Sequence, residues 1–343
     1  MDLSRTQSLN FTSAECEAAY TIRSSALLNV FNAFQVLLSV VSLITIYNVS
    51  LSKETSKVFS ILSKNLKVLI SVGTFGFLGL TAVTVIVLYS YILAINLLDQ
   101  PPCFYVWPAL HCFLFRSVLH YCVVGFTVLH VVILIERSYV AFVSQHNEQF
   151  DTFGRLLVAG LFIVPFLVVV FMYGSEDLVH SHRVYCSAGS SRSTKNVIFV
   201  TYVCAAVDLI TTITDFFLYL FVKRQAKRLL SRNSNYQLEK SFVLREIRTS
   251  IRVIYPLSVI HTIALAPFPF IYVIGRPQQQ SLQLALYVEA ALLFKTMYTV
   301  IVPCTLWFLK KRKPNEVYEW MKPMEEQRNV HFIELNRYFD RKQ

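Results

Sequence analysis

Long stretches without a single charged residue constrain the fold of this chain more than any other feature of its sequence. Four stretches contain no Asp, Glu, Lys or Arg and are rich in Leu, Ile, Val and Phe: residues 24–52, 68–98, 156–175 and 253–275. A helix needs roughly 20 apolar residues to cross the hydrocarbon core of a bilayer. Each stretch is therefore long enough to be read as a membrane span.

Three further apolar segments contain only one or two charges, which brings the expected number of spans to seven. Apolar runs of this length without period-2 alternation are helical in a membrane, because each backbone group must find its partner within the segment. The sequence therefore predicts an all-α membrane protein, a seven-transmembrane helix bundle. The expected parts are a tail at 1–24, a bundle at 25–309 with spans at about 25–50, 68–97, 112–135, 155–174, 196–222, 251–275 and 282–309, and a tail at 310–343.

The composition excludes other classes of protein. Apolar residues make up 55% and charged residues 15% of the 343 residues, whereas soluble domains have about 45–50% and about 25%. The net charge of +11 does not indicate nucleic-acid binding, because the basic residues lie next to the spans. The chain has no Gly-rich phosphate loop and no His-Glu-x-x-His, Cys-x-x-Cys or Gly-x-Ser-x-Gly motif. We therefore expect no enzymatic activity, no cofactor and no metal site.

The distribution of Lys and Arg predicts the orientation, because cytoplasmic loops carry an excess of both. With the amino terminus outside, the inner segments hold 24 of these residues and the outer segments hold 6. The glycosylation sequon Asn10-Phe11-Thr12 then falls in the outer tail, on the side where glycosylation occurs. We expect an outer amino terminus glycosylated at Asn10 and an inner carboxyl terminus.

The seven cysteines divide between the spans and the outer side. Within the spans, Cys122, Cys204 and Cys304 are interpreted as small packing residues. The other four lie on the oxidising side, which permits three disulfide pairings or free thiols. A bridge from Cys112, at the outer mouth of the third span, to Cys186 would tether the loop between spans four and five across the bundle. Cys16 and Cys103 would then form the second pair.

The third span resembles that of G-protein-coupled receptors. Its inner end reads Glu136-Arg137-Ser138-Tyr139, which is similar to the acidic-Arg-x-Tyr ending of this span in rhodopsin-like receptors. Cys112 and Arg137 are 25 residues apart, or about 37 Å of helix, so they lie at opposite faces of a bilayer. The chain departs from the ordinary rhodopsin-like pattern where Val302 replaces the usual Asn before Pro303.

A closer resemblance is to nematode serpentine chemoreceptors of the Sra group, including its Srab branch. It rests on Tyr236-Gln237-Leu238-Glu239 before the sixth span, on Cys16 in a short outer tail, on Pro101-Pro102-Cys103, and on the Glu-Arg-Ser-Tyr segment. The resemblance implies a chemosensory G-protein-coupled receptor, active in the perception of chemical stimuli such as olfaction. Its partners would be a small-molecule ligand and a heterotrimeric G protein. It would be located in the plasma membrane of sensory neurons or their cilia.

The ionisable residues inside the spans are the candidate ligand-binding residues, because such residues are costly in a membrane. Arg116 and His120 are one helical turn apart, so they can meet a ligand together, or Arg116 can extend to the outer interface. Asp208 and Asp215 are seven apart and share a face. They would neutralise Arg116, Lys295 or a cationic ligand, or be protonated packing residues. Glu289 is expected at the rim of the pocket.

Two other functions remain open at this point. Opsins attach retinal to a lysine in the seventh span, but Lys295 is eight residues before Pro303 where the opsin lysine is seven before its proline. One residue rotates a helix position by about 100°, which turns this amine away. A seven-span ligand-gated channel of the insect chemoreceptor kind is the second alternative, although those channels have an inner amino terminus.

At the inner face, we expect Glu136 to hold Arg137 in the inactive state and ligand binding to open a crevice for the G protein. Tyr139 belongs to the same motif. Basic residues of the third inner loop would face the G protein or bind anionic lipid, which is worth about 1 kcal/mol per residue. These residues are Lys223, Arg224, Lys227 and Arg228. For the run Lys310-Lys311-Arg312-Lys313 in the tail, lipid is the expected partner.

Overall fold

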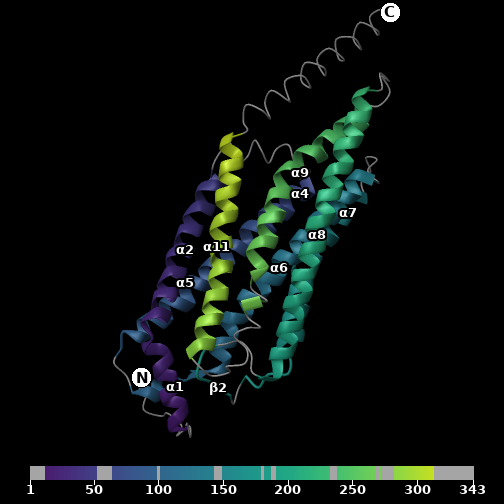
Figure 1. Cartoon of the computed structure of the whole chain (residues 1–343). Helices are drawn as coiled ribbons and strands as arrows, with labels where there is room; N and C mark the ends of the chain where they lie inside the picture. The colour runs from purple at the N-terminus through teal and green to yellow at the C-terminus, as the bar shows by residue number, and fades with distance from the viewer. Residues whose placement is uncertain are drawn as a thin grey trace, which may run out of the picture.

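The structure, a computed structural model, is an elongated bundle of long helices that run side by side (Figure 1). It describes residues 12–51, 64–98, 101–142, 149–178, 181–186, 191–231, 238–267, 270–271 and 282–312. The bundle consists of α2 (Ala26–Leu51), α4 (Lys64–Val68) with the π-helical η1 (Leu69–Gly76) and α5 (Phe77–Asn96), then α6 (Ala109–Phe142), α7 (Gln149–Tyr173), α8 (Ser191–Ser231), α9 (Leu238–Leu265) and α11 (Leu282–Arg312).

Seven helical segments of the described chain match the seven expected spans. Six of them are long and apolar enough to cross a membrane, and α9 adds a shorter apolar stretch at Ile254–Leu265. Several helices continue past the charge-free runs. For example, α8 extends to Ser231 and α9 begins at Leu238. Charge-free runs mark only the apolar part of a helix, since backbone hydrogen bonding can continue into polar sequence.

The polarity of α2 shows an interior suited to a membrane protein. Its buried side chains include Asn32, Gln35 and Ser39, whereas Leu37 and Ile44 are more than half exposed. The polar residues recur at helical spacing, so they line one face of the helix. An extensive exposed apolar surface of this kind requires a non-aqueous environment, and a lipid bilayer supplies it.

Helix α6 lies at the centre of the helix packing. It contacts α5, α7, α8 and α9, while α2 packs against α5 and α11, and α8 pairs with α9. η1 and α6 approach closely at Gly73, where an added Cβ would lie 2.4 Å from Leu129 Cδ1, so the leucine side chain would have to shift. The polar residues of α6 therefore face several helices at once.

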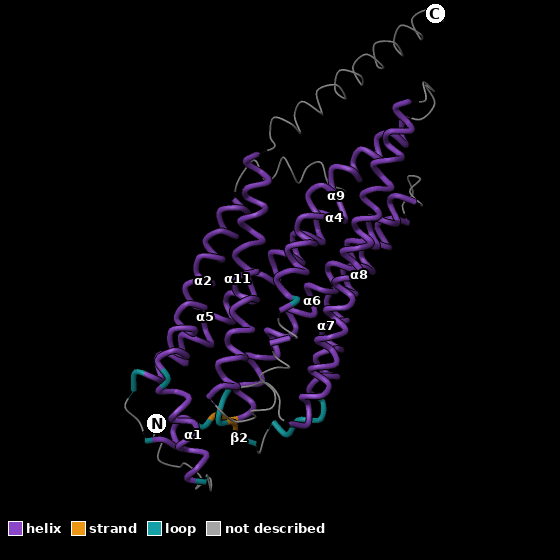
Figure 2. Tube along the Cα trace, viewed as in Figure 1, coloured by secondary structure: helices purple, strands orange, loops and turns teal. Residues whose placement is uncertain are grey.

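One end of the bundle is covered by short elements (Figure 2). Part of the segment expected as a polar tail folds into a helix, α1 (Ser13–Ser24), which begins with a capping box between Thr12 and Glu15. The strands β1 (Trp107–Pro108) and β2 (His182–Arg183) pair antiparallel, and η2 (Pro102–Tyr105) precedes β1. We call this the disulfide end, and the opposite end, where α6 carries Arg137, the Arg137 end.

Two disulfides hold these short elements in place. Cys16 of α1 is bonded to Cys103 of η2, and Cys112 at the start of α6 is bonded to Cys186 of the α7–α8 loop. The structure thus contains one of the three possible pairings, with Cys112 joined to Cys186. The Cys112–Cys186 bridge holds the α7–α8 loop against the start of α6. At the same end of the bundle, the guanidinium carbon of Arg23 in α1 lies 4.7 Å from the centre of the Trp107 ring.

Candidate functional site

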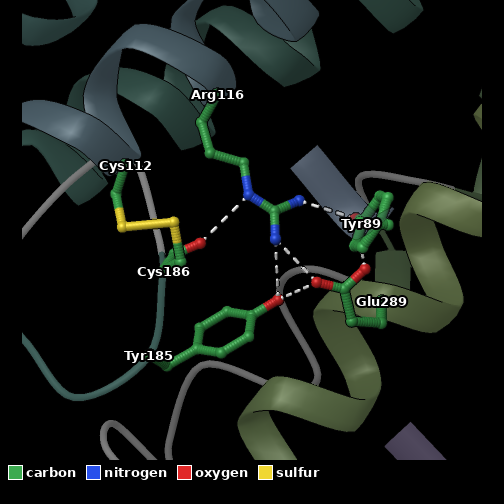
Figure 3. The surroundings of a disulfide bond; sticks show 6 residues. All are labelled: Tyr89, Cys112, Arg116, Tyr185, Cys186 and Glu289. Carbon is green, nitrogen blue, oxygen red and sulfur yellow. Dashed lines mark hydrogen bonds and ion pairs between the residues drawn. A yellow bond between two sulfur atoms is a disulfide. The ribbon is translucent and has the colours of Figure 1, made fainter. Parts of the chain in front are cut away.

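A buried ion pair between α6 and α11 lies beside the Cys112–Cys186 bridge (Figure 3). Arg116 Nη2 donates to Glu289 Oε1 at 2.7 Å. Nε donates to the backbone oxygen of Cys186 at 3.0 Å, Nη1 donates to the Tyr89 hydroxyl at 2.9 Å, and Nη2 also donates to the Tyr185 hydroxyl at 3.2 Å. Arg116 is 3% exposed and Glu289 is 1% exposed.

The carboxylate of Glu289, like the guanidinium of Arg116, makes several hydrogen bonds in addition to the ion pair. Gln35 donates to Oε2 at 2.9 Å, and the hydroxyls of Tyr89 and Tyr185 donate to Oε2 and Oε1. Burial and the neighbouring carboxylate raise the pKa of Tyr185, in the loop, well above its ordinary value. This phenol therefore keeps its proton and remains a donor to Glu289.

This arrangement corrects two expectations from the sequence. Arg116 does not extend to the interface, and Glu289 is not at the rim of a pocket, because both side chains are buried in one network. A fully hydrogen-bonded charge pair has few groups left for a ligand. The Arg116–Glu289 pair therefore joins α6, α11 and the disulfide loop.

The cavity next to this network lies among α6, α7, α8, α9 and α11. Its volume is about 30 Å³, and its polar lining includes His120, Thr127, Thr201, Asp208 and Lys295. His120 Nδ1 lies 2.8 Å from the backbone oxygen of Arg116 and 3.1 Å from the Tyr173 hydroxyl. The remaining lining is largely apolar, a combination typical of sites for small organic ligands.

A second polar cluster lies further along α6 toward the Arg137 end. Asp208 Oδ1 is 3.5 Å from His130 Nδ1 and 3.1 Å from His261 Nε2. Asp215 Oδ2 is 3.1 Å from His130 Nε2 and accepts a hydrogen bond from Ser258 at 2.7 Å. All the side chains of this cluster are buried.

The structure places partners beside the two aspartates that were not expected from the sequence. We expected Asp208 and Asp215 to neutralise Arg116, Lys295 or a cationic ligand, or to be protonated packing residues. Their described contacts are to histidines and hydroxyl groups. Sequence reasoning missed His130 and His261 because histidine was not counted as a charge in the search for interrupted apolar runs. Counting polar residues within the spans would have found both.

A third polar cluster ties α6 to α9 near the Arg137 end. The Arg137 guanidinium pairs with Glu136, with 2.6 Å between Nη2 and Oε1, and Nη1 donates to Ser250 Oγ at 3.0 Å. Glu136 is 0% and Arg137 1% exposed. The pairing expected from the Glu-Arg-Ser-Tyr segment is therefore present, with an additional bond across to α9.

The other residues expected at this end have separate surroundings. The Tyr139 ring centre lies 4.7 Å from that of Phe153, so Tyr139 packs against α7. Lys223 lies 5.9 Å from the ring of Tyr219, and Arg224 is exposed. The remaining expectations fall on residues whose side chains lie outside the described structure, namely Asn10, Lys227, Arg228 and Lys310-Lys311-Arg312-Lys313.

Comparison with known proteins identifies one family. The chain matches, over residues 13–342, the family described as serpentine type 7TM GPCR receptor class ab chemoreceptor. The match covers the tail helix, all the bundle helices and nearly all of the carboxyl-terminal segment. No match was found among curated proteins.

Proposed function

We propose that this chain, which belongs to the serpentine class ab family of seven-transmembrane G-protein-coupled chemoreceptors, binds a small molecule near the disulfide end. Binding would activate a heterotrimeric G protein at the Arg137 end. Family membership makes the chain a multi-pass membrane protein and a chemoreceptor. The site of the ligand, the coupling to a G protein and a location in the plasma membrane of sensory neurons or their cilia are parts of the proposal.

The observation that carries the coupling proposal is the buried contact between Arg137 and Ser250. It joins α6 to α9 at the end where both helices carry polar sequence, and Glu136 holds the guanidinium in place. A ligand that binds better to an arrangement with α6 and α9 apart shifts the population toward it. Separation of the helices would expose Arg137 and open a crevice in which the G protein binds.

For the ligand we propose the cavity lined by His120, Lys295 and Asp208. In the described structure the lining of this cavity does not include Arg116, Glu289 or Asp215. We therefore propose fewer ligand-binding residues than the sequence suggested. A volume of about 30 Å³ is far below the roughly 300–1,000 Å³ of ligand sites. Binding therefore requires the surrounding helices to move, which couples occupancy to helix position.

Removing the contact between α6 and α9 should change signalling while the amount of receptor at the cell surface stays the same. Arg137→Ala is expected to reach the cell surface and to lose most of its ligand-stimulated signal. Ser250→Ala removes the bond between Ser250 on α9 and Arg137 on α6, worth about 1 kcal/mol, and should raise basal signalling about fivefold by releasing the closed arrangement. The measurement is a second-messenger assay over a ligand panel, normalised to surface expression.

Two matched substitutions control for nonspecific effects in that assay. Arg155→Ala removes an exposed arginine from α7, and Ser117→Ala removes a hydroxyl that donates within its own helix. Both should signal as the unaltered receptor does. An undiminished ligand response in Arg137→Ala would remove the proposed role of this residue.

Glycosylation mapping tests the proposed orientation, with the disulfide end outside. We expect the full-length receptor expressed in eukaryotic cells to shift to lower mass on glycosidase treatment, and Asn10→Gln to abolish that shift. Asn48, at the other end of α2, carries a second sequon, and Asn48→Gln is the control that should change nothing. An unmodified tail that reacts with reagents only after permeabilisation would contradict the orientation and favour a channel.

Proposals for the basic residues follow from the same orientation. Lys223, Arg224, Lys227 and Arg228 lie beyond the apolar part of α8, toward the Arg137 end, and would face the G protein. The run at 310–313 would bind anionic lipid headgroups, whose surface potential attracts basic segments next to a membrane.

A further inference from the structure

We propose that His130, Asp208 and His261 form a binding site for a divalent transition-metal ion such as Zn²⁺. The ligand atoms are His130 Nδ1 on α6, Asp208 Oδ1 on α8 and His261 Nε2 on α9, and all three lie within 4.8 Å of one another. All three side chains are buried. Imidazole and carboxylate groups are the common ligands of this class of ion.

The two distances that involve Asp208 suit a shared ion, and the two histidine nitrogens lie within 4.8 Å of each other. A tetrahedral Zn²⁺ with bonds of about 2.0–2.2 Å places its ligand atoms about 3.3–3.5 Å apart. Asp208 Oδ1 is 3.5 Å from His130 Nδ1 and 3.1 Å from His261 Nε2. The two histidine nitrogens therefore flank one carboxylate oxygen at spacings that need adjustments of only a few tenths of an ångström.

The same three atoms make no hydrogen bond within the part of the chain that is described, although each is buried. Their mutual contacts are short but lack hydrogen-bond geometry. Buried polar atoms are normally hydrogen-bonded, because leaving one unsatisfied is costly. Three such atoms that lie together on three helices indicate a shared partner that is not a protein group.

The opposite polar atom of each ligand side chain is held by a further residue. His130 Nε2 contacts Asp215 at 3.1 Å, His261 Nδ1 contacts the Tyr298 hydroxyl at 3.0 Å, and Asp208 Oδ2 accepts from Thr127 at 2.9 Å. If His130 Nε2 and His261 Nδ1 carry the protons and donate them to these residues, the other nitrogen of each ring keeps a lone pair for the ion. Metal-binding histidines are oriented in this way by carboxylate and other acceptors.

The fourth coordination position has an approach from the ligand cavity. Of the three ligand residues, Asp208 lines that cavity, so we place the open coordination position on the cavity side of the site. A site with three protein ligands and one open position is the usual pattern for zinc that exchanges its fourth ligand.

The sequence offered no sign of this site, because its ligands come from three separate helices. His130 and His261 are 131 residues apart, so no short motif contains two ligands. The competing explanation of the cluster is an ion pair between Asp208 and protonated histidines. That explanation requires no metal, and the two are distinguished by measuring metal directly.

The test uses the full-length receptor purified in lipid nanodiscs, stripped with a chelator and then exposed to Zn²⁺ alone. We expect about one equivalent of zinc per chain after gel filtration, by elemental analysis, and a rise in the thermal unfolding midpoint. Mg²⁺ and Ca²⁺ should produce neither effect. Co²⁺ in place of zinc should give the visible absorption of a tetrahedral site with nitrogen and oxygen ligands.

Variants locate the ion within the chain. His261→Ala and Asp208→Asn should abolish stoichiometric zinc, and Tyr298→Phe, which keeps the ring but loses the hydroxyl, should weaken affinity by about 10- to 100-fold. His111→Ala, which removes an exposed histidine from the start of α6, is the control and should bind zinc normally. Zinc bound equally well by His261→Ala would overturn the site.

The unaltered receptor decides the question even if a variant fails to fold. Absence of stoichiometric zinc and of any thermal shift in that protein would leave an ion pair of protonated histidines as the explanation and would overturn the proposal. The readouts are binding and stability, so they do not depend on the proposed ligand or on G-protein coupling.

Discussion

Glu289→Gln is expected to destabilise the receptor by about 3–5 kcal/mol, the usual cost of removing one partner from a buried ion pair. Arg116 would keep its positive charge at a buried position while the carboxylate that compensates it is lost. The tyrosines that donate to Glu289 would also lose a charged acceptor. The measurement is the thermal unfolding midpoint of purified receptor, together with the fraction that reaches the cell surface.

A double variant shows whether the loss of stability in Glu289→Gln comes from the unpaired charge or from the changed side chain. Arg116→Met combined with Glu289→Gln removes both charges, and it should be more stable than Glu289→Gln alone because no unpaired charge remains. Glu17→Gln, which removes an exposed carboxylate from α1, is the control and should change little. Equal midpoints for Glu289→Gln and the unaltered receptor would contradict the structural role of the pair.

Loss of the Cys112–Cys186 bridge is the second change with a large expected effect. Cys186→Ser should cost about 4 kcal/mol, because the bridge closes a loop of 74 residues. It should also free the backbone at Cys186 to move, which weakens the hydrogen bond that its oxygen accepts from Arg116. We expect low surface expression and a lowered unfolding midpoint, measured with and without reductant.

The other disulfide provides a matched comparison. The Cys16–Cys103 bridge closes a longer loop of 87 residues, so loop length alone predicts that Cys16→Ser is at least as damaging. The contacts predict the reverse, since Cys186 is adjacent to the Arg116 network. A larger loss from Cys16→Ser than from Cys186→Ser would show that the network contributes little to stability.

The number and helical nature of the spans could be predicted from apolar runs with at most two charges, because hydrocarbon disfavours charges and unpaired backbone groups. Helix α1 was also readable in principle, since Thr12 and Glu15 have the spacing of a capping box. The ends of the helices could not be predicted in this way. Nothing in an apolar run shows how far a helix continues into water.

The candidate site was only partly predictable. Arg116, Glu289 and Arg137 stood out because each is a charge within or next to an apolar run, but their partners depend on how distant helices pack. Glu289 is 173 residues from Arg116 along the chain, and no local pattern links the two. His130 and His261 were missed because a neutral imidazole does not interrupt an apolar run in the way a charge does.

The three polar clusters share one stripe of α6. Arg116, His130 and Arg137 are separated by 14 and 7 residues, which corresponds to about 21 Å and about 10 Å along the axis. Positions seven residues apart drift by about 20° around the helix, so the three side chains project within about 60° of one another. A small rotation of α6 about its own axis would therefore turn all three side chains in the same sense, and the three layers of contacts would change together.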